Sequence, residues 1–508
     1  MSSIRRELVY AAINRVYYLI DFNIYDDLHK QFEFQKQLIL DDDSLTKDER
    51  TEAIRLLNRD YDRNKVRNNV GTKRICENCN QECLATLYCE HCVRNYLKIN
   101  FANWTSGNGD IDNLIQKCQM ETYVPYKIIE WIPYDNLNEI KYFKKGGFSK
   151  IYTAIWTDGS YEEWDFKERK LTRFGSTGVI LKTLENVKNA NQSWFEEAKS
   201  HLTIGNKWEE VARCFGITRD PSNGNYMLVI RKMDTDLRKY LQQNHNQLTW
   251  RERLRITYEI TNALYFIHRE DAIHRDLHSG NILYSQFNNT WYISDLGFCG
   301  PVDKSSKSIY GNLPYIAPEV IAGKKYTFKS DIYSVAMLMW EISSGQQPFV
   351  NYAHDYDLAM NIINGIRPKI SSKIPLEYKN LMEQCWDADP SKRPDIFTLD
   401  ERIGEIHLSC QNEPNELTCQ SNVNSNDLEM NKINMDYTSN RLFTSKVHQF
   451  ENFPEPRNAT KEEQEAFYSK SYSYNDDGFN SLISEDNSKS RLSEEFNKIQ
   501  INDDETPI

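Results

Sequence analysis

The sequence predicts an α+β chain whose largest part is bilobal, with a strand-rich lobe followed by a helix-rich lobe. Four short alternating runs are typical of strands, namely KIYTAIW (150–156), GVILKTL (178–184), RCFGIT (213–218) and YMLVI (226–230). Longer runs that are apolar nearly all round, such as RERLRITYEITNALYFIH and DIYSVAMLMWEISSG, are typical of helices buried inside a lobe. Two consecutive lobes of this kind leave a cleft between them, which is a usual place for a ligand.

Composition restricts the class of protein. The 508 residues carry a formal charge of −12 at pH 7, whereas a nucleic-acid-binding surface is normally basic, so nucleic acid is an unfavoured partner. No apolar run reaches the length of a membrane span. The start, MSSIRRELVYAAINRVYYLIDF, is interrupted by Arg15 and Asp21 and favours an amphipathic helix over a signal peptide. We therefore expect a cytoplasmic protein, with the nucleus as the second choice.

Changes in composition divide the chain into four segments. Residues 1–74 are charged and predicted to be helical, and residues 75–125 hold a cysteine cluster and a linking segment. Residues 136–407 form the large two-lobed region. The tail, residues 408–508, is rich in Asn, Ser, Asp, Glu and Lys without sustained periodicity, so we expect it to be disordered apart from short apolar islands such as Arg441–Phe443.

The cysteine cluster predicts a small structural zinc knuckle or ribbon. Five of the eleven cysteines lie between positions 76 and 92. Cys76 with Cys79, and Cys89 with Cys92, form two Cys-x-x-Cys pairs, and each pair can give two thiolates to one tetrahedral zinc ion. Without a secretory signal, such clustering favours a metal over disulfides. The alternative is a set of reduced cysteines in a flexible segment.

Polar residues in the two-lobed region follow the order that phosphoryl transfer requires. That chemistry needs a loop over the phosphates, a cation on them, oxygen ligands for magnesium, and an acceptor for the proton of the attacking hydroxyl. The candidates, in chain order, are Gly146, Gly147 and Phe148 between two strand-like runs, Lys182 in VILK, Glu197 in WFEEAKSHL, Asp276 and Asn281 after a long helix, and Asp295 after WYIS. Each has an ordinary structural explanation when taken singly, but their joint order favours phosphoryl transfer.

The two-lobed region resembles a eukaryotic protein kinase domain over its full length, of the tyrosine-kinase-like branch. VILK is similar to the lysine strand, HRDLHSGN to the catalytic loop, DLG to the metal-binding triplet and APE (317–319) to the end of the activation segment. SDIYSVA and CWDADPSKRP resemble later kinase signatures. With the cysteine cluster and the segment NFANWTSGNGDIDNLIQKCQ, the layout resembles a large kinase-like family expanded in certain soil fungi.

The resemblance implies a role for each candidate. Asp276 would orient the acceptor hydroxyl and take its proton, Asn281 and Asp295 would hold Mg²⁺, and Lys182, paired with Glu197, would contact the α- and β-phosphates of ATP. The ATP pocket would also include Gly146, Gly147, Phe148, Ser149, Ile151, Ile180, Ile230, Met233 and Leu283. Further supporting roles would belong to Arg275, which would anchor a phosphorylated activation segment, to Asp331, which would support the catalytic loop, and to Arg393, which would pair with Glu319.

Three features depart from the kinase pattern. The glycine-rich motif falls on Lys144, Gly146 and Ser149, so one glycine of three is kept. Ile180 stands where an alanine usually covers the adenine, which narrows the pocket. His278 stands where many serine/threonine kinases carry a lysine that contacts the γ-phosphate; it either donates to phosphate, with a charge only when protonated, or hydrogen-bonds within the loop.

We predict an ATP- and Mg²⁺-dependent protein kinase that acts in intracellular signalling on Ser or Thr of protein substrates, with Tyr as the less favoured acceptor. The activation segment would be regulated by phosphate on one of Ser305, Ser306 and Ser308, although a plain polar loop is the alternative. The rival to the enzyme is a pseudokinase or ATP-binding scaffold that binds signalling partners through the zinc knuckle or the tail. A small-molecule phosphotransferase is disfavoured by the APE motif.

Overall fold

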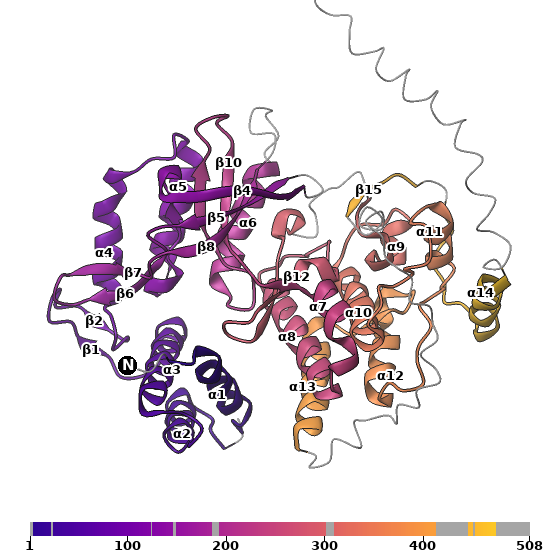
Figure 1. Ribbon diagram of the computed structural model, residues 1–508, viewed down its shortest axis with the longest axis horizontal. Coiled ribbons are helices and arrows are strands. Elements are labelled where there is room, and N and C mark those ends of the chain that lie inside the picture. The colour runs from indigo at the N-terminus through magenta and orange to yellow at the C-terminus, as the bar shows by residue number, and fades with distance from the viewer. Residues whose placement is uncertain are drawn as a thin grey trace, which may run out of the picture.

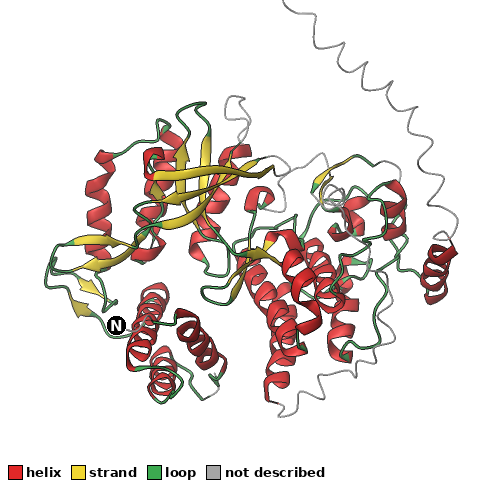
Figure 2. Cartoon of the chain, in the orientation of Figure 1, coloured by secondary structure: helices red, strands yellow, loops and turns green. Residues whose placement is uncertain are grey.

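The computed structural model describes residues 4–21, 24–122, 124–145, 149–184, 193–300, 309–412, 445–450 and 453–473. Figure 1 shows a strand-rich lobe beside a helical lobe, with the N-terminal helices below the strands. Figure 2 shows the same division by secondary structure, with most strands in one lobe and most helices in the other. Among the described residues, no helix is both long enough and apolar enough to cross a membrane.

The N-terminal region is a bundle of three helices, α1 (Arg6–Tyr18), α2 (Leu28–Leu40) and α3 (Lys47–Asn68). Each helix contributes one apolar face to a shared core, as expected of amphipathic helices. The buried members of that core are Val9, Ala12, Val16, Phe32, Ile39, Leu45, Ala53, Leu56 and Leu57.

The strand-rich lobe contains a six-stranded sheet in the order β3-β9-β10-β8-β5-β4. Its strands are β3 (Glu130–Trp131), β4 (Leu137–Lys145), β5 (Lys150–Trp156), β8 (Thr177–Thr183), β9 (Cys214–Arg219) and β10 (Tyr226–Arg231). All neighbours are antiparallel except β3 and β9. The alternating runs in the sequence thus predict the four central strands to within one residue. Strands β9 and β10 are buried or half-buried on both faces, except at Arg219. Helix α6 (Ser193–Lys207) packs against this lobe.

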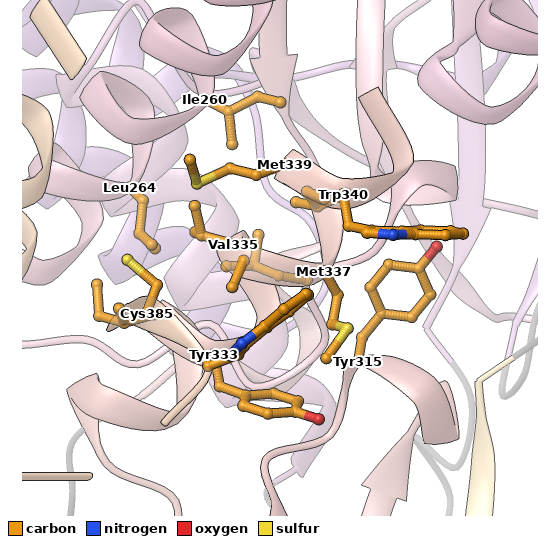
Figure 3. Close-up of a cluster of buried hydrophobic side chains, with 14 of the residues drawn as sticks. Ile260, Leu264, Tyr315, Tyr333, Val335, Met337, Met339, Trp340 and Cys385 are labelled. Atoms are coloured by element: carbon orange, nitrogen blue, oxygen red, sulfur yellow. The ribbon is translucent and has the colours of Figure 1, made fainter. Parts of the chain in front are cut away.

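The helical lobe is built around α10 (Phe328–Ser344), in which every residue from Ser330 to Ile342 is buried. Figure 3 shows α10 side chains packed with Ile260 and Leu264 of α8 (Trp250–Arg269) and with Cys385 of α12 (Leu376–Cys385). The remaining helices are α7 (Leu237–Asn244), α9 (Pro318–Ile321), α11 (Tyr356–Ile363) and α13 (Ile396–Asn412), and a small sheet joins β11 (Thr235–Asp236), β12 (Ile282–Ser285) and β13 (Thr290–Ile293). The apolar runs in the sequence therefore correctly predict helices buried inside a lobe.

Short 3-10 segments connect many of these elements. They are η1 (Phe101–Asn103), η2 (Pro125–Lys127), η3 (Tyr134–Asn136), η4 (His245–Gln247), η5 (Ser279–Asn281), η6 (Leu296–Phe298), η7 (Leu313–Tyr315) and η8 (Pro390–Lys392). Asn281 of the site described below lies in η5, and Asp295 directly precedes η6.

The cysteine cluster lies in a small module, residues 74–100, between the helical bundle and the strand-rich lobe. It consists of a hairpin with two-residue strands, β1 (Arg74–Ile75) and β2 (Glu82–Cys83), followed by α4 (Glu90–Asn100). The hairpin β6 (Tyr161–Asp165) with β7 (Lys170–Arg173), which the sequence interpretation did not identify, packs on this module through Trp164 and Leu171. Helix α5 (Gly109–Glu121) then joins the core of α6.

Two buried charges attach α3 to the cysteine module. Asp62 accepts hydrogen bonds from the backbone N–H groups of Thr86 and Leu87, both at 2.7 Å, and pairs with Lys65 at 2.8 Å. Lys65 in turn donates to the carbonyl of Leu84 at 2.9 Å. Since buried charges need partners, the loop between the two cysteine pairs is fixed by this helix.

The prediction of a disordered tail from residue 408 is wrong for two stretches. Helix α13 continues to Asn412, and residues 445–450 and 453–473 lie against the helical lobe, with β15 (Lys446–His448) paired to β14 (Ile309–Gly311) and α14 (Lys461–Ser473) beyond it. Phe450, Phe453 and Phe467 pack on the main core, which supplies the buried apolar area that composition alone did not suggest. The island Arg441–Phe443 lies outside the described residues.

We expect Asp62→Asn to loosen the loop between the cysteine pairs. Removing one partner of a buried ion pair costs about 3–5 kcal/mol because the other charge stays buried and uncompensated. Hydrogen exchange followed by mass spectrometry should show faster exchange of the Thr86 and Leu87 amides. Asp26→Asn is the matched control, because that side chain is 68% exposed and pairs only with exposed Lys30. Equal exchange in both variants would contradict the expectation.

Candidate functional site

Three charged side chains meet where the two lobes face each other. Lys182 of β8 places its Nζ 2.8 Å from Glu197 Oε1 of α6 and 2.6 Å from Asp295 Oδ1, just before η6. Burial alone lowers the pKa of Lys182, but the two carboxylates outweigh it and hold that pKa above its ordinary value. For Asp295, burial raises the pKa and Lys182 outweighs it, so the carboxylate stays ionised. The structure thus brings Lys182, Glu197 and Asp295 together.

The backbone around Asp295 allows α6 to approach this closely. Asp295 has φ 61°, in the left-handed region that short polar side chains tolerate. A Cβ at Gly297 would lie 3.2 Å from Glu197 Oε1 and 3.2 Å from Asp295 Oδ1. The glycine of DLG is therefore needed for space beside the carboxylates.

The segment HRDLHSGN is held by buried Asp331 at the start of α10. Its carboxylate oxygens accept from the backbone N–H groups of His274 at 2.7 Å and Arg275 at 2.9 Å, and from His268 Nε2 at 2.9 Å. Arg275, with φ 71°, is in a conformation that a large side chain rarely adopts. Asp331 thus accepts hydrogen bonds from the backbone amides of this segment. This is the supporting position that the resemblance to kinases implied for Asp331.

Asp276 and Asn281 are adjacent in space as well as in the motif. Asn281 Nδ2 donates to the carbonyl of Asp276 at 2.9 Å, and the Asn281 carbonyl accepts from Ser294 N at 2.8 Å, next to Asp295. Burial raises the pKa of Asp276 to about 7, against the lowering effect of a hydroxyl group that donates to it. That hydroxyl belongs to Ser445, whose Oγ lies 2.7 Å from Asp276 Oδ1.

His278 faces the same hydroxyl. Its Nδ1 accepts from the backbone N–H of Gly280 at 3.0 Å, so the proton of a neutral ring lies on Nε2, which is 3.1 Å from Ser445 Oγ. Burial holds the pKa of His278 well below its ordinary range, so the ring is neutral. His278 therefore makes the hydrogen bond within the loop through Nδ1, while its Nε2 faces Ser445 Oγ at the site.

The expected adenine-pocket residues line one face of the sheet. Ile151 pairs with Lys182 across β5 and β8, and Ile180 pairs with Ile230 across β8 and β10. Directly paired side chains in antiparallel strands share a face, so these three isoleucines lie on the same side as Lys182. Leu283, on β12 of the helical lobe, and Met233, between β10 and β11, are half-buried, and Ser149 is buried.

Part of the expected site is not described. Gly146, Gly147 and Phe148 of the glycine-rich loop, and Ser305, Ser306 and Ser308 of the activation segment, lie outside the described residues. Lys144 is described and exposed, next to Ile151 in the neighbouring strand.

The end of the activation segment is fixed by a buried ion pair. Arg393 donates to both carboxylate oxygens of Glu319, each at 2.8 Å. Two parallel bonds of this kind are stronger and more directional than a single contact. Arg393 also donates to the carbonyls of Lys329 and Asp387, so the guanidinium ties α9 to the loop after α12.

The four cysteines of the two Cys-x-x-Cys pairs converge on one point. Their Sγ atoms all lie within 4.8 Å of one another, with Cys76 and Cys92 3.6 Å apart and Cys79 and Cys89 3.6 Å apart. Zn–S bonds of about 2.3 Å place tetrahedral sulfur ligands about 3.8 Å apart, so the set fits zinc. Asn78 Nδ2 lies 3.3 Å from Cys92 Sγ, as a second-layer hydrogen bond.

The sequence interpretation missed Ser445 as a member of the site. It lies in a polar tail, more than 160 residues from Asp276, and a single serine there carries no signal. The sequence TKEE at Thr460–Glu463 is a capping box that forms at the start of α14, and with the three phenylalanines it is the signal that could have predicted a docked segment.

A family model described as protein tyrosine and serine/threonine kinase matches residues 137–403. A dual serine/threonine and tyrosine protein kinase of Homo sapiens is 34% identical over 200 residues, which are 39% of this chain and 20% of that protein. The protein of the same name from Pimephales promelas is 30% identical over 232 residues (44% and 24%), and the dual specificity protein kinase zakA of Dictyostelium discoideum is 31% identical over 191 residues (34% and 24%). The chain matches a quarter or less of the length of these relatives.

We expect Glu319→Gln to destabilise the helical lobe by about 3–5 kcal/mol, because Arg393 would stay buried without a negative partner and would face an NH2 group in place of one acceptor oxygen. The free energy of unfolding in urea, followed by tryptophan fluorescence, measures the change. Glu405→Gln, an exposed glutamate of α13, is the control and should change little. A Glu319→Gln variant as stable as this control would contradict the expectation.

Proposed function

Because the chain belongs to the protein tyrosine and serine/threonine kinase family, we propose that it transfers the γ-phosphate of ATP to hydroxyl groups of protein substrates. The observation that carries the proposal is the contact of Lys182 Nζ with both Glu197 and Asp295. An active protein kinase requires this lysine–glutamate pair and the metal-binding aspartate to be in place together. A chain that had lost the activity would be under no requirement to keep a buried charge cluster that is costly to form.

Each residue of the cluster has a defined task in the proposed reaction. Lys182 contacts the α- and β-phosphates and Glu197 holds its ammonium in position. Asn281 and Asp295 hold Mg²⁺, since amide and carboxylate oxygens are the ligands that this ion prefers. The bound Mg²⁺–nucleotide supplies the phosphoryl group and neutralises its charge. Asp276 orients the acceptor hydroxyl and receives its proton, consistent with the 2.7 Å contact that it already makes with a serine hydroxyl.

The acceptor proposed is Ser or Thr in preference to Tyr. The distance of 2.7 Å between Asp276 and a serine Oγ supports a short hydroxyl side chain at this place. A tyrosine oxygen lies several ångströms further from its backbone, so it would require the substrate backbone to be displaced outward. The neutral His278 beside the hydroxyl supplies a hydrogen-bond donor where many serine/threonine kinases have lysine.

A rival proposal is an ATP-binding scaffold with little phosphoryl transfer. Ile180 favours it, because this side chain shares the cleft face with Ile151 and Ile230 and takes up room for adenine. The exposed Lys144 in place of a glycine favours it too. The preserved cluster around Lys182 argues for the enzyme.

We expect full-length protein with labelled ATP and Mg²⁺ to transfer phosphate to a generic protein substrate. Asp276→Asn should lower the rate by about 10²–10⁴-fold, which is the usual contribution of a general base. Lys182→Met should lower it comparably. Lys141→Met is the matched control, since Lys141 lies on the same sheet with its side chain 72% exposed. Phosphoamino-acid analysis then identifies the acceptor.

An absence of label from folded protein that binds ATP would support the scaffold instead. Ile180→Ala is informative in either case, because a smaller side chain should tighten ATP binding if Ile180 narrows the pocket. Isothermal titration with an ATP analogue measures that affinity.

We propose separately that Cys76, Cys79, Cys89 and Cys92 hold a structural zinc ion. The convergence of four thiols on one point supports this, since metal binding supplies folding free energy to small domains. A signalling partner at this module or the tail, and a cytoplasmic or nuclear location, stay predictions from the sequence.

We expect the purified chain to contain one zinc ion, measured by mass spectrometry of the metal. The double variant Cys76→Ser, Cys89→Ser should contain none and should lose protease resistance around α4, because half of the ligands are gone. Cys118→Ser is the control, as a buried cysteine of α5 outside the cluster. A double variant with undiminished zinc would show that the ion is bound elsewhere.

A further inference from the structure

The segment 445–450 lies along the activation segment as an added β-strand. In the antiparallel pairing of β15 with β14, Ile309 faces His448, Tyr310 faces Val447 and Gly311 faces Lys446. Addition of an extended peptide to an exposed strand is a common mode of peptide recognition, in which main-chain hydrogen bonds give affinity and side-chain pockets give specificity. Figure 1 shows β15 beside α9 and α11, on the helical lobe.

The strand that receives this segment is itself fixed close to the catalytic aspartate. Tyr310 stacks on Phe298 of η6 with ring centroids 3.8 Å apart. Gly311 has φ 142°, and a Cβ there would lie 3.4 Å from Asp276 Oδ1. A segment paired to β14 is therefore delivered to Asp276 by its register.

The residue that arrives at Asp276 is a serine. Ser445 Oγ lies 2.7 Å from Asp276 Oδ1 and 3.1 Å from His278 Nε2. The geometry of a general base requires a heavy-atom distance of about 2.6–3.2 Å to the group that it deprotonates. The hydroxyl group of Ser445 lies within this distance of Asp276.

The neighbouring residues of the strand are also held. His448 is buried, with Nε2 3.0 Å from the carbonyl of Gly311, and Lys446 Nζ donates to the carbonyl of His354 at 3.2 Å. The side chains on both sides of the pairing therefore have partners on the helical lobe, which fixes the register that puts Ser445 at Asp276.

The chain beyond the strand anchors the segment further. Phe453 stacks on Tyr356 of α11 with centroids 4.9 Å apart. Asn458 accepts from the backbone N–H of Ala388 at 2.9 Å, and Tyr468 of α14 donates to the carbonyl of Arg367 at 2.7 Å. These contacts spread over more than 20 residues, so the docked segment is a specific arrangement with many partners.

We propose that Ser445 is a phosphorylation site of the chain's own active centre, presented in cis by the docked residues 445–450 and 453–473. This inference rests on the proposed kinase activity and names its first substrate. Ser445 Oγ attacks the γ-phosphorus of ATP, the bond from that phosphorus to the β–γ bridging oxygen breaks, and ADP leaves. The hydroxyl proton passes to Asp276, so the products are phosphoserine, ADP and one proton.

The same arrangement makes the segment a competitor of outside substrates. While residues 445–448 pair with β14, another peptide cannot add to that strand. Phosphorylation places two further negative charges beside Asp276 and near Asp295, and like charges at this distance repel. The docked segment thus occupies the edge of β14 until Ser445 is modified, and its release then exposes that edge.

The test uses the full chain after phosphatase treatment, incubated with Mg²⁺ and ATP over about a hundredfold range of protein concentration. Mass spectrometry follows Ser445, and a generic protein substrate in the same mixture reports the proposed function independently. We expect phosphate on Ser445 at a first-order rate that does not depend on concentration, because a tethered segment has a fixed effective concentration. Ser445→Ala should lose this phosphate, while Thr444→Ala, a neighbouring hydroxyl, should keep it.

A second variant tests the docking itself. Phe453→Ala removes the stack on Tyr356, eight residues from the acceptor. If the docking equilibrium becomes about tenfold less favourable, Ser445 phosphorylation should slow by about tenfold. It should also speed phosphorylation of the outside substrate. Phe397→Ala, whose side chain is 60% exposed on the helical lobe, is the matched control and should change neither rate.

Four results would overturn the inference. Labelled outside substrate with unmodified Ser445 would leave the kinase activity standing and reject the site. A rate that rises in proportion to protein concentration, or a Phe453→Ala variant that phosphorylates Ser445 as fast as the control, would reject presentation in cis. Absence of label from both would reject the proposed function and this inference together.

Discussion

The placement of Lys182 between two carboxylates is the constraint on which the rest of the site depends. An ammonium group taken out of water costs several kcal/mol unless its charge is matched, and here Glu197 and Asp295 both lie within 2.8 Å of it. The three residues come from β8, α6 and the start of η6, which belong to both lobes. The cleft therefore has this geometry only when the helix, the sheet and the loop before the activation segment are all in place.

The N-terminal parts of the chain support the position of Glu197 beside Lys182, because they pack against α6. Helix α5 contributes Ile111, Leu114, Ile115 and Cys118 to the same core as Ala198 and Leu202 of α6, so the helix that carries Glu197 is supported from behind. Gln119 of α5 donates to the carbonyl of Ile129 at 2.6 Å, which ties α5 to the sheet as well. The cysteine module and the hairpin β6–β7 pack in turn on residues 124–128. The extension is thus part of the support of the helix that carries Glu197 rather than an appendage.

Sequence patterns predicted much of this because many of the forces are local. Alternation of apolar residues predicts the four central strands, continuous apolar runs predict α8 and α10, and ordered motifs predict which polar residues meet in the cleft. The matched family confirms the bilobal kinase fold that those motifs implied. The hairpin β6–β7 escaped prediction because only Trp164 and Leu171 are buried in it and its other residues are polar. No periodicity marks such a pair, and its position depends on the cysteine module that it covers.

The tail shows most clearly where composition fails. Its mean polarity is that of an unstructured chain, yet residues 445–450 and 453–473 dock because a few aromatic rings pack on an existing core and one short strand pairs with β14. The free energy that stabilises such a docked segment comes from its contacts with the helical lobe. No local pattern in the tail sequence encodes those contacts. Serine at position 445 gains meaning only from the register of β15 on β14, and that register is set by His448, Phe450 and Phe453 further along the chain. The hydroxyl at Asp276 is thus a consequence of long-range packing, whereas the aspartate that receives it was evident from the motif.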